Sequence, residues 1–149
     1  MEKNRRRSSH VEISFIIHAT EDPDKVLKAA KNILPEEYAE DVKYEKNVLT
    51  GYHKNPIIMI KTSIKEKIRA AALLKRILGK LEADDRALLS SGFRSHIDSK
   101  GSLYIRLDKQ EAFLGRIKFC SVDPIRIKTK LNIVPTTLKE LESISDTEK

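Results

Sequence analysis

Cysteine is nearly absent from this 149-residue chain, and tryptophan is missing altogether. The single Cys120 has no second cysteine with which to form an internal disulfide. The lack of a Cys-x-x-Cys pair also removes the common structural zinc sites. We therefore expect Cys120 to be a small, buried or half-buried hydrophobe.

Long apolar runs are lacking as well. The longest, such as Ile57–Ile60 and Ala70–Leu74, span a few residues, whereas crossing a bilayer takes about 20. The basic residues at 5–7 are followed by an alternating pattern rather than by the unbroken apolar stretch of a secretory signal. We expect a cytoplasmic protein with no membrane partner.

Sequence motifs for catalysis are also missing. The chain has no His-Glu-x-x-His helix, no Gly-x-Ser-x-Gly elbow and no phosphate loop. Asp84 with Asp85, and Asp98 with Asp108, could form the metal site of a nuclease, although acids at a helix start also favour the helix macrodipole. We predict a non-enzyme without cofactor or metal, with a metal-dependent nuclease as the third alternative.

Positive charge is what the chain does have, with a formal net charge of +7 and a pI near 9.5. Residues 51–81 hold eight Lys or Arg against the single acid Glu66, and residues 99–134 hold eight against three acids. Such a surplus favours nucleic acid as a partner, and an anionic membrane surface second. Charge-rich surfaces also occur in thermophilic proteins, so a merely solvated surface remains an alternative.

The hydrophobic pattern predicts an α+β fold: a largely antiparallel sheet with helices packed on one face and the other face open to water. We expect a single domain over residues 10–133, a flexible basic arm at 1–9 and a polar tail at 134–149. Strands are predicted at 11–17, 42–48, 57–60, 103–107, 117–119 and 125–131, and helices at 23–34, 63–81, 82–89 and 109–114. Ser63 is the expected cap of the second helix.

Basic residues alternate with apolar ones on the last three predicted strands. If these strands are neighbours, their polar positions place six cations and one aromatic ring on a single sheet face. These are Tyr104, Arg106, Arg116, Lys118, Arg126, Lys128 and Lys130. Such an array could follow a phosphate backbone while Tyr104 stacks on an unpaired base. The alternative is a solvated face whose charges block edge pairing.

Two further basic features are weaker. Lys65, Arg69, Arg76 and Lys80 lie on one side of the second predicted helix and form a secondary basic ridge. A solvated lysine-rich helix face also explains this ridge. The arginines at 5–7 could add phosphate contacts from a flexible arm.

Three stretches together resemble a known family: His18–Val26, Gly51–Ile57 and Leu103–Ala112. The chain is similar over residues 10 to about 133 to archaeal proteins described as RNA-binding proteins and predicted exosome subunits. The resemblance implies a fold like that of ribosomal protein L5 and a partner in RNA-processing machinery.

The motif residues of that family include polar groups suited to phosphate or base-edge contacts. They are Asn55, Arg106, Lys109 and Gln110, with His53 and Lys54 in the same loop as Asn55. We predict a non-catalytic RNA-binding module whose partners include RNA and exosome or other RNA-processing proteins, and a homodimer stays open. The alternative is a protein-interaction adaptor of an RNA-degrading complex without direct RNA contact.

Overall fold

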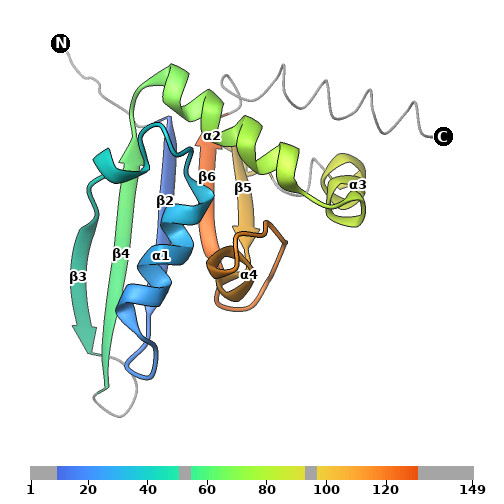
Figure 1. Ribbon diagram of the computed structural model, residues 1–149. Coiled ribbons are helices and arrows are strands. Elements are labelled where there is room, and N and C mark those ends of the chain that lie inside the picture. Colours follow the sequence, from blue (N-terminus) through green and yellow to red (C-terminus); the bar gives the residue numbers. More distant parts are fainter. Residues whose placement is uncertain (1–9, 51–54, 93–96, 131–149) are drawn as a thin grey trace.

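A five-stranded antiparallel sheet forms the centre of the protein in a computed structural model, which describes residues 10–50, 55–92 and 97–130. The strands are β2 (Val11–Ile17), β3 (Glu45–Thr50), β4 (Pro56–Ile64), β5 (Ser102–Leu107) and β6 (Ile125–Lys130). Their order across the sheet is β3-β4-β2-β6-β5 (Figure 1). The first strand is therefore central, and the two last strands lie side by side at one edge.

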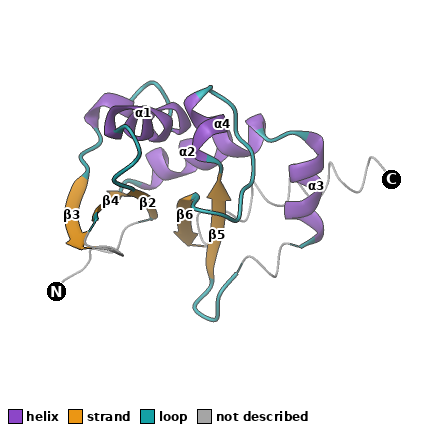
Figure 2. Ribbon diagram, turned by 90° about the horizontal axis from the view of Figure 1, so that it is seen from below, coloured by secondary structure: helices purple, strands orange, loops and turns teal. Residues whose placement is uncertain are grey.

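Helices cover one face of this sheet. They are α1 (Pro23–Ile33), α2 (Lys67–Lys80), α3 (Ala83–Ser91) and α4 (Lys109–Phe113), with a short 3-10 turn at Ala39–Asp41. Figure 2 shows α1, α2 and α4 on the same side of the strands, while α3 lies beyond the β5 edge. No described helix covers the opposite face. The predicted α+β class, with helices on one face, is confirmed.

Helix starts follow from local chemistry. The Asp22 side chain accepts a hydrogen bond from the Asp24 amide at 3.0 Å, and Pro23 takes the first helical position of α1. Asp108 caps α4 in the same way through the Glu111 amide at 2.9 Å. Gly115, with φ of 84°, follows α4 in the left-handed conformation that favours glycine.

The core lies between the sheet and the helix layer. Alternation in β2 buries Val11, Ile13, Phe15 and Ile17, while Glu12, Ser14 and Ile16 point to the open face. Polar side chains also join the helices to each other. Asn32 of α1 donates to the Ala112 and Phe113 carbonyls of α4 at 3.0 and 3.1 Å, and Arg76 of α2 donates to the Asn32 carbonyl at 3.2 Å.

The second helix begins later than predicted. β4 continues to Ile64, so Ser63 belongs to the strand and is not a helix cap. Thr62 explains the difference, because it is buried and its hydroxyl donates to the Lys43 carbonyl at 2.6 Å. A residue that looked polar in the sequence is part of the buried strand face.

Two other strand predictions also change. The strand predicted at 42–48 forms at Glu45–Thr50, as the β3 edge of the sheet. The strand predicted at 117–119 is wrong, because within the described residues this segment makes isolated bridges from Ile117 to Leu81 and from Phe119 to Leu107. The segment therefore runs past the end of β5 without extending the sheet as a full strand.

Candidate nucleic-acid interface

Four basic side chains of β5 and β6 share the open face of the sheet. The pairing places Tyr104 opposite Lys128, and Arg106 opposite Arg126, with Lys130 two residues further along β6. Arg106, Arg126 and Lys130 are exposed, and Lys128 is half-buried. We call Arg106, Arg126, Lys128 and Lys130 the basic face.

Charge compensation at the basic face comes from nearby carboxylates and not from ion pairs, since Lys128 helps to lower the pKa of Asp98 and has Glu12 as its cross-strand neighbour. Among the described residues none of its four cations makes an ion pair, whereas Lys31, Lys61, Lys109 and Arg116 each contact a carboxylate. Arg106 and Arg126 stand directly opposite each other across neighbouring strands. Like charges in that position destabilise a sheet. Such a pair lowers the stability of the sheet and makes no compensating ion pair in the described part of the chain. This arrangement is typical of a surface that binds an anionic partner.

Tyr104 stands between two of these cations. The guanidinium of Arg106 lies 5.8 Å from its ring centroid and the ammonium of Lys128 lies 5.9 Å from it. The Tyr104 hydroxyl donates to Asp98 at 3.1 Å. Hydrogen bonds from the Ser102 and Lys100 amides and from Tyr104, together with the nearby charge of Lys128, lower the pKa of Asp98. The ring is thus held in place beside the basic face.

Acidic residues are few on the rest of the open face. Glu12 of β2 is the cross-strand neighbour of Lys128, but its carboxylate accepts from Lys61 of β4 at 3.2 Å. Lys61 thus lies on the same face, two strands away from β6. Lys61 was not among the binding residues predicted from the sequence. The available signal was its place in β4 between Ile60 and Thr62, whose side chains are buried on the other face.

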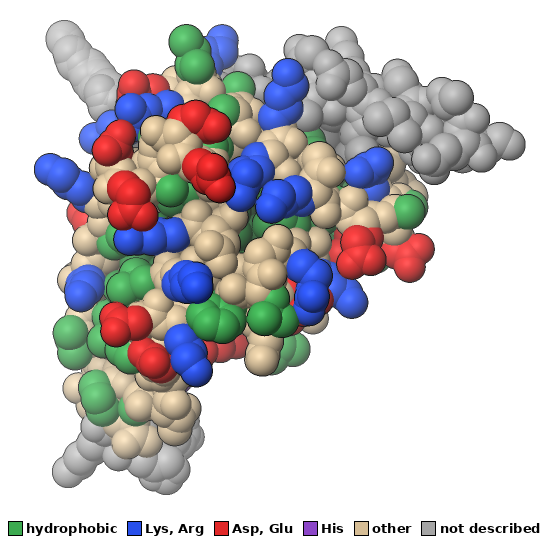
Figure 3. Space-filling model, viewed as in Figure 1, with side chains coloured by type: hydrophobic (Ala, Val, Ile, Leu, Met, Phe, Trp, Pro, Cys, Tyr) green, Lys and Arg blue, Asp and Glu red, His purple; other side chains and the backbone are tan. Residues whose placement is uncertain are grey.

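The helix-covered side has a different charge pattern. There acidic and basic side chains are intermingled across the surface (Figure 3). Exposed lysines of the helix layer such as Lys25, Lys28 and Lys75 also lack an ion pair among the described residues, so the basic face differs in the position of its cations, which stand beside one another on paired strands.

Arg116 and Lys118 do not join the basic face as predicted. The guanidinium of Arg116 is bound to Glu111 through two hydrogen bonds of 2.9 and 3.3 Å, and this contact lowers the pKa of Glu111. Lys118 is exposed on the segment beside β5, where its carbonyl accepts from the Asp108 amide at 2.8 Å. Because this segment is not a full strand, the predicted set of six cations is reduced to four.

Lys109 is the largest departure from prediction. Its side chain is 11% exposed, and its ammonium donates to the Ile16 carbonyl, to Glu21 at 3.1 Å and to Asp123 at 2.9 Å. This cation is already bonded on several sides and tethers α4 to the end of β2. These contacts give Lys109 a structural role, and its RNA contact stays a prediction.

The other motif positions lie apart from the basic face. Gln110 is exposed on α4, in the helix layer, and Asn55 is exposed just before β4. His53 and Lys54 lie outside the described residues. The structure thus does not bring this group together with the β5–β6 cations.

The predicted secondary ridge is not a free basic surface. Lys65 precedes α2, and Arg69 pairs with Glu66 at 3.3 Å and stacks on Tyr38, 5.0 Å from the ring centroid. Arg76 is half-buried against α1. Lys80 is exposed at the last position of the helix. The ridge arginines therefore serve packing between α2 and its neighbours.

One cluster among the described residues has the spacing of a metal site. Ligand atoms of His18, Glu21 and Asp123 lie within 4.8 Å of one another. The Lys109 ammonium already bonds both carboxylates of this cluster and places one positive charge between them. The acids considered for a nuclease do not converge: Asp98 accepts bonds from its own turn and Asp108 caps α4, while Asp84 is exposed on α3.

Fold and site together define a small α+β protein in which one face of the antiparallel sheet is basic and carries no helix in the part of the chain that the structure describes. A family model described as RNA binding matches residues 10–131. The chain belongs to this RNA-binding family.

Relatives of the chain are archaeal. The RNA-binding protein PAB1135 of Pyrococcus abyssi is 36% identical over 131 residues, which cover 87% of this chain and 85% of the relative. Protein MJ0213 of Methanocaldococcus jannaschii is 34% identical, with 89% of each chain covered. The crystal structure of protein SSO0741 from Sulfolobus solfataricus, of the DUF54 family, shares the fold with a TM-score of 0.76, at 24% identity over 93% of this chain and 98% of its own.

Among the described residues no helix is long and apolar enough to cross a membrane.

Proposed function

We propose that this chain binds RNA along the open face of its sheet. The observation that carries the proposal is the set of unpaired cations on β5 and β6, two of them directly opposite each other. Neighbouring strands lie about 4.8 Å apart and same-face residues about 6.6 Å apart, so these side chains can reach successive phosphates of one strand. The family match and the name of the Pyrococcus relative support this function.

Tyr104 adds a contact to a base, whereas the cations contact phosphates. Its ring lies beside Arg106 and Lys128, so an unpaired base can stack on it while the flanking phosphates meet the cations. Base stacking of this kind is tolerant of sequence. The proposed ligand is therefore an RNA with at least one unpaired segment.

Salt dependence tests the proposal directly. Binding that engages four phosphates of a single strand should give a log-log salt slope of about −3. The triple variant Arg126→Ala/Lys128→Ala/Lys130→Ala should lose about two units of that slope and at least tenfold in affinity at low salt. The measurement is a fluorescence-anisotropy titration at several salt concentrations.

A matched triple variant on the helix side controls for net charge. Lys25→Ala/Lys28→Ala/Lys75→Ala removes three exposed cations, so both variants carry a formal charge of +4 in place of +7. The control should bind RNA nearly as well as the parent protein. Equal losses in the two variants would show that net charge, not the basic face, attracts the RNA.

The biological setting is a finer part of the proposal. We place the protein in archaeal RNA processing or degradation, with the exosome as the partner that the sequence resemblance implies and with no catalysis of its own. The alternative, an adaptor that contacts protein, draws on the exposed apolar side chains Val48, Leu49 and Met59 of β3 and β4. Purified protein that ignores RNA but co-elutes with an RNA-degrading complex would favour the adaptor.

A further inference from the structure

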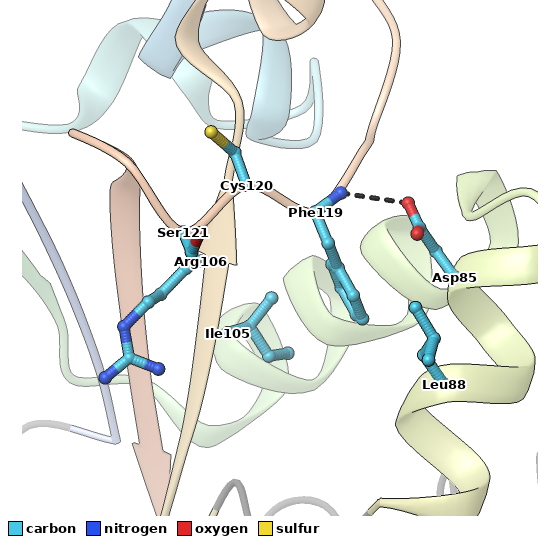
Figure 4. Close-up of a pocket in the computed structure, with 7 residues that line it drawn as sticks. All are labelled: Asp85, Leu88, Ile105, Arg106, Phe119, Cys120 and Ser121. Carbon is cyan, nitrogen blue, oxygen red and sulfur yellow. Dashed lines mark hydrogen bonds between the residues drawn. The ribbon is translucent and has the colours of Figure 1, made fainter.

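A hollow of about 290 Å³ lies beside the edge of β5 that faces away from β6, between this strand, α3 and the segment at 119–121. Figure 4 shows Ile105, Leu88 and Phe119 converging on it, with Asp85 next to Phe119. The lining is mostly apolar. Pockets of this character accept neutral, flat or apolar groups and orient them with a few polar atoms.

Arg106 connects this hollow with the basic face. It lines the hollow, yet its guanidinium points away from Leu88 and Phe119 in Figure 4 and lies over the Tyr104 ring on the open face. A polyanion whose phosphate meets Arg106 therefore passes the rim of the hollow. One nucleotide can place its phosphate on the face and turn its base over the β5 edge.

The charge of Asp85 decides which part of the ligand can enter. Its residue is 9% exposed, and one carboxylate oxygen accepts from the Phe119 amide at 2.9 Å. The other oxygen has no hydrogen-bond donor among the described residues. A carboxylate in the wall repels a phosphate group but accepts an N–H from the edge of a base. The hollow thus suits the base and not the backbone.

Leu88 supplies the outer wall. Its side chain is 58% exposed on α3, which leaves apolar surface in water that a base would cover. Burial of that surface against the planar ring of a base is favourable and adds to the contact of the base with Phe119.

We propose that this hollow is a nucleobase pocket that receives one unpaired base of the RNA bound on the basic face, with Asp85 accepting an N–H from the base edge. The inference rests on the proposed function, because the basic face must first hold the strand. It adds a specificity: the protein should prefer single-stranded RNA over duplex, since a paired base cannot leave its stack without a cost.

Filling the pocket tests the inference. Leu88→Trp places a large ring in the hollow, and Ala87→Trp, at the next exposed position of α3, adds the same ring away from its lining. Three probes of the same length, about twelve nucleotides, are titrated against each protein: a single-stranded RNA, its duplex, and the single strand with abasic riboses at its centre. Leu88→Trp should bind the intact single strand about tenfold more weakly, with the duplex and the abasic strand changed less than about twofold.

Other outcomes separate the two proposals. The pocket is overturned if Leu88→Trp binds the intact strand as tightly as the parent does, or if it loses affinity equally for all three probes. Salt-dependent binding to the basic face would still stand in either case. If the parent shows no salt-dependent binding to any of the three probes, the proposed function and the pocket are both overturned. Leu88→Ala introduces no bulk and should weaken the intact strand alone by about threefold; an unchanged affinity in this variant also counts against the pocket.

Discussion

Lys109 shows at the scale of a single residue how a motif lysine can be structural. Its ammonium pairs with both Glu21 and Asp123 in a setting where little water reaches it. Removing one partner from such a group leaves charge unpaired. Lys109→Met should therefore lower the free energy of unfolding by about 2 kcal/mol, less than for a fully buried pair because both carboxylates are partly exposed. Urea denaturation measures the change.

The matched control is Lys31→Met, which removes an exposed lysine paired with Glu40 at 3.2 Å. It should change stability by less than about 0.5 kcal/mol. RNA affinity of folded Lys109→Met should equal that of the parent at the same salt. A large loss of RNA affinity without a loss of stability would return Lys109 to the binding surface.

At the scale of the element, α2 shows where the sequence pattern was ambiguous. Helical spacing in the sequence predicts an apolar stripe of Ile64, Ile68, Ala71, Leu74, Leu78 and Leu81. However, Ile64 belongs to β4 and Ile68 is 85% exposed. The buried side of the helix contains Leu74 and Leu78 of the predicted stripe together with Ala70, Leu73 and Ile77. Apolar residues recur at helical spacing from Ile64 as well as from Ala70. The sequence alone therefore does not show where β4 ends and the helix begins.

A pair of substitutions in α2 tests which of its residues face the core. Leu73→Ala removes a fully buried side chain and should cost about 2–5 kcal/mol. Ile68→Ala removes an exposed side chain of similar size and should change stability by less than about 0.5 kcal/mol. The midpoint of thermal or urea unfolding compares them. Similar losses in the two variants would contradict the helix phase described above.

Elements differ in how far the sequence predicts them. β2, α1 and β5 follow from unambiguous alternation or capping, as at Asp22 and Pro23. The basic alternation of β6 also predicted which side chains face outward. The segment at 116–119 alternates equally well, but Arg116 bonds Glu111 and the Phe119 amide bonds Asp85, contacts that no local pattern contains. The hollow was missed for the same reason, because α3 and β5 meet there only in the fold.

The whole molecule responds to alkaline pH through its half-buried tyrosines. Burial raises the pKa of Tyr44 from 10.0 to about 12, so the folded state holds this proton more tightly than the unfolded state between these two values. Stability from Tyr44 is therefore complete below pH 10.0 and is lost as the pH rises to about 12. We expect the loss of stability from this titration to be on the order of 1 kcal/mol, because partial exposure of Tyr44 reduces the effect of the shift.

Tyr44→Phe isolates this contribution. The Tyr44 hydroxyl is buried with no hydrogen-bond partner among the described residues, and its ring meets Phe15 at 6.5 Å in an edge-on arrangement that phenylalanine can keep. The variant should match or exceed the parent's stability at neutral pH, since it removes an unsatisfied hydroxyl. Above pH 10.0 its stability should decline less steeply than the parent's. Parallel declines in the two proteins would mean that other groups, such as the lysines, carry the alkaline loss and that Tyr44 titrates alike in the folded and unfolded chain.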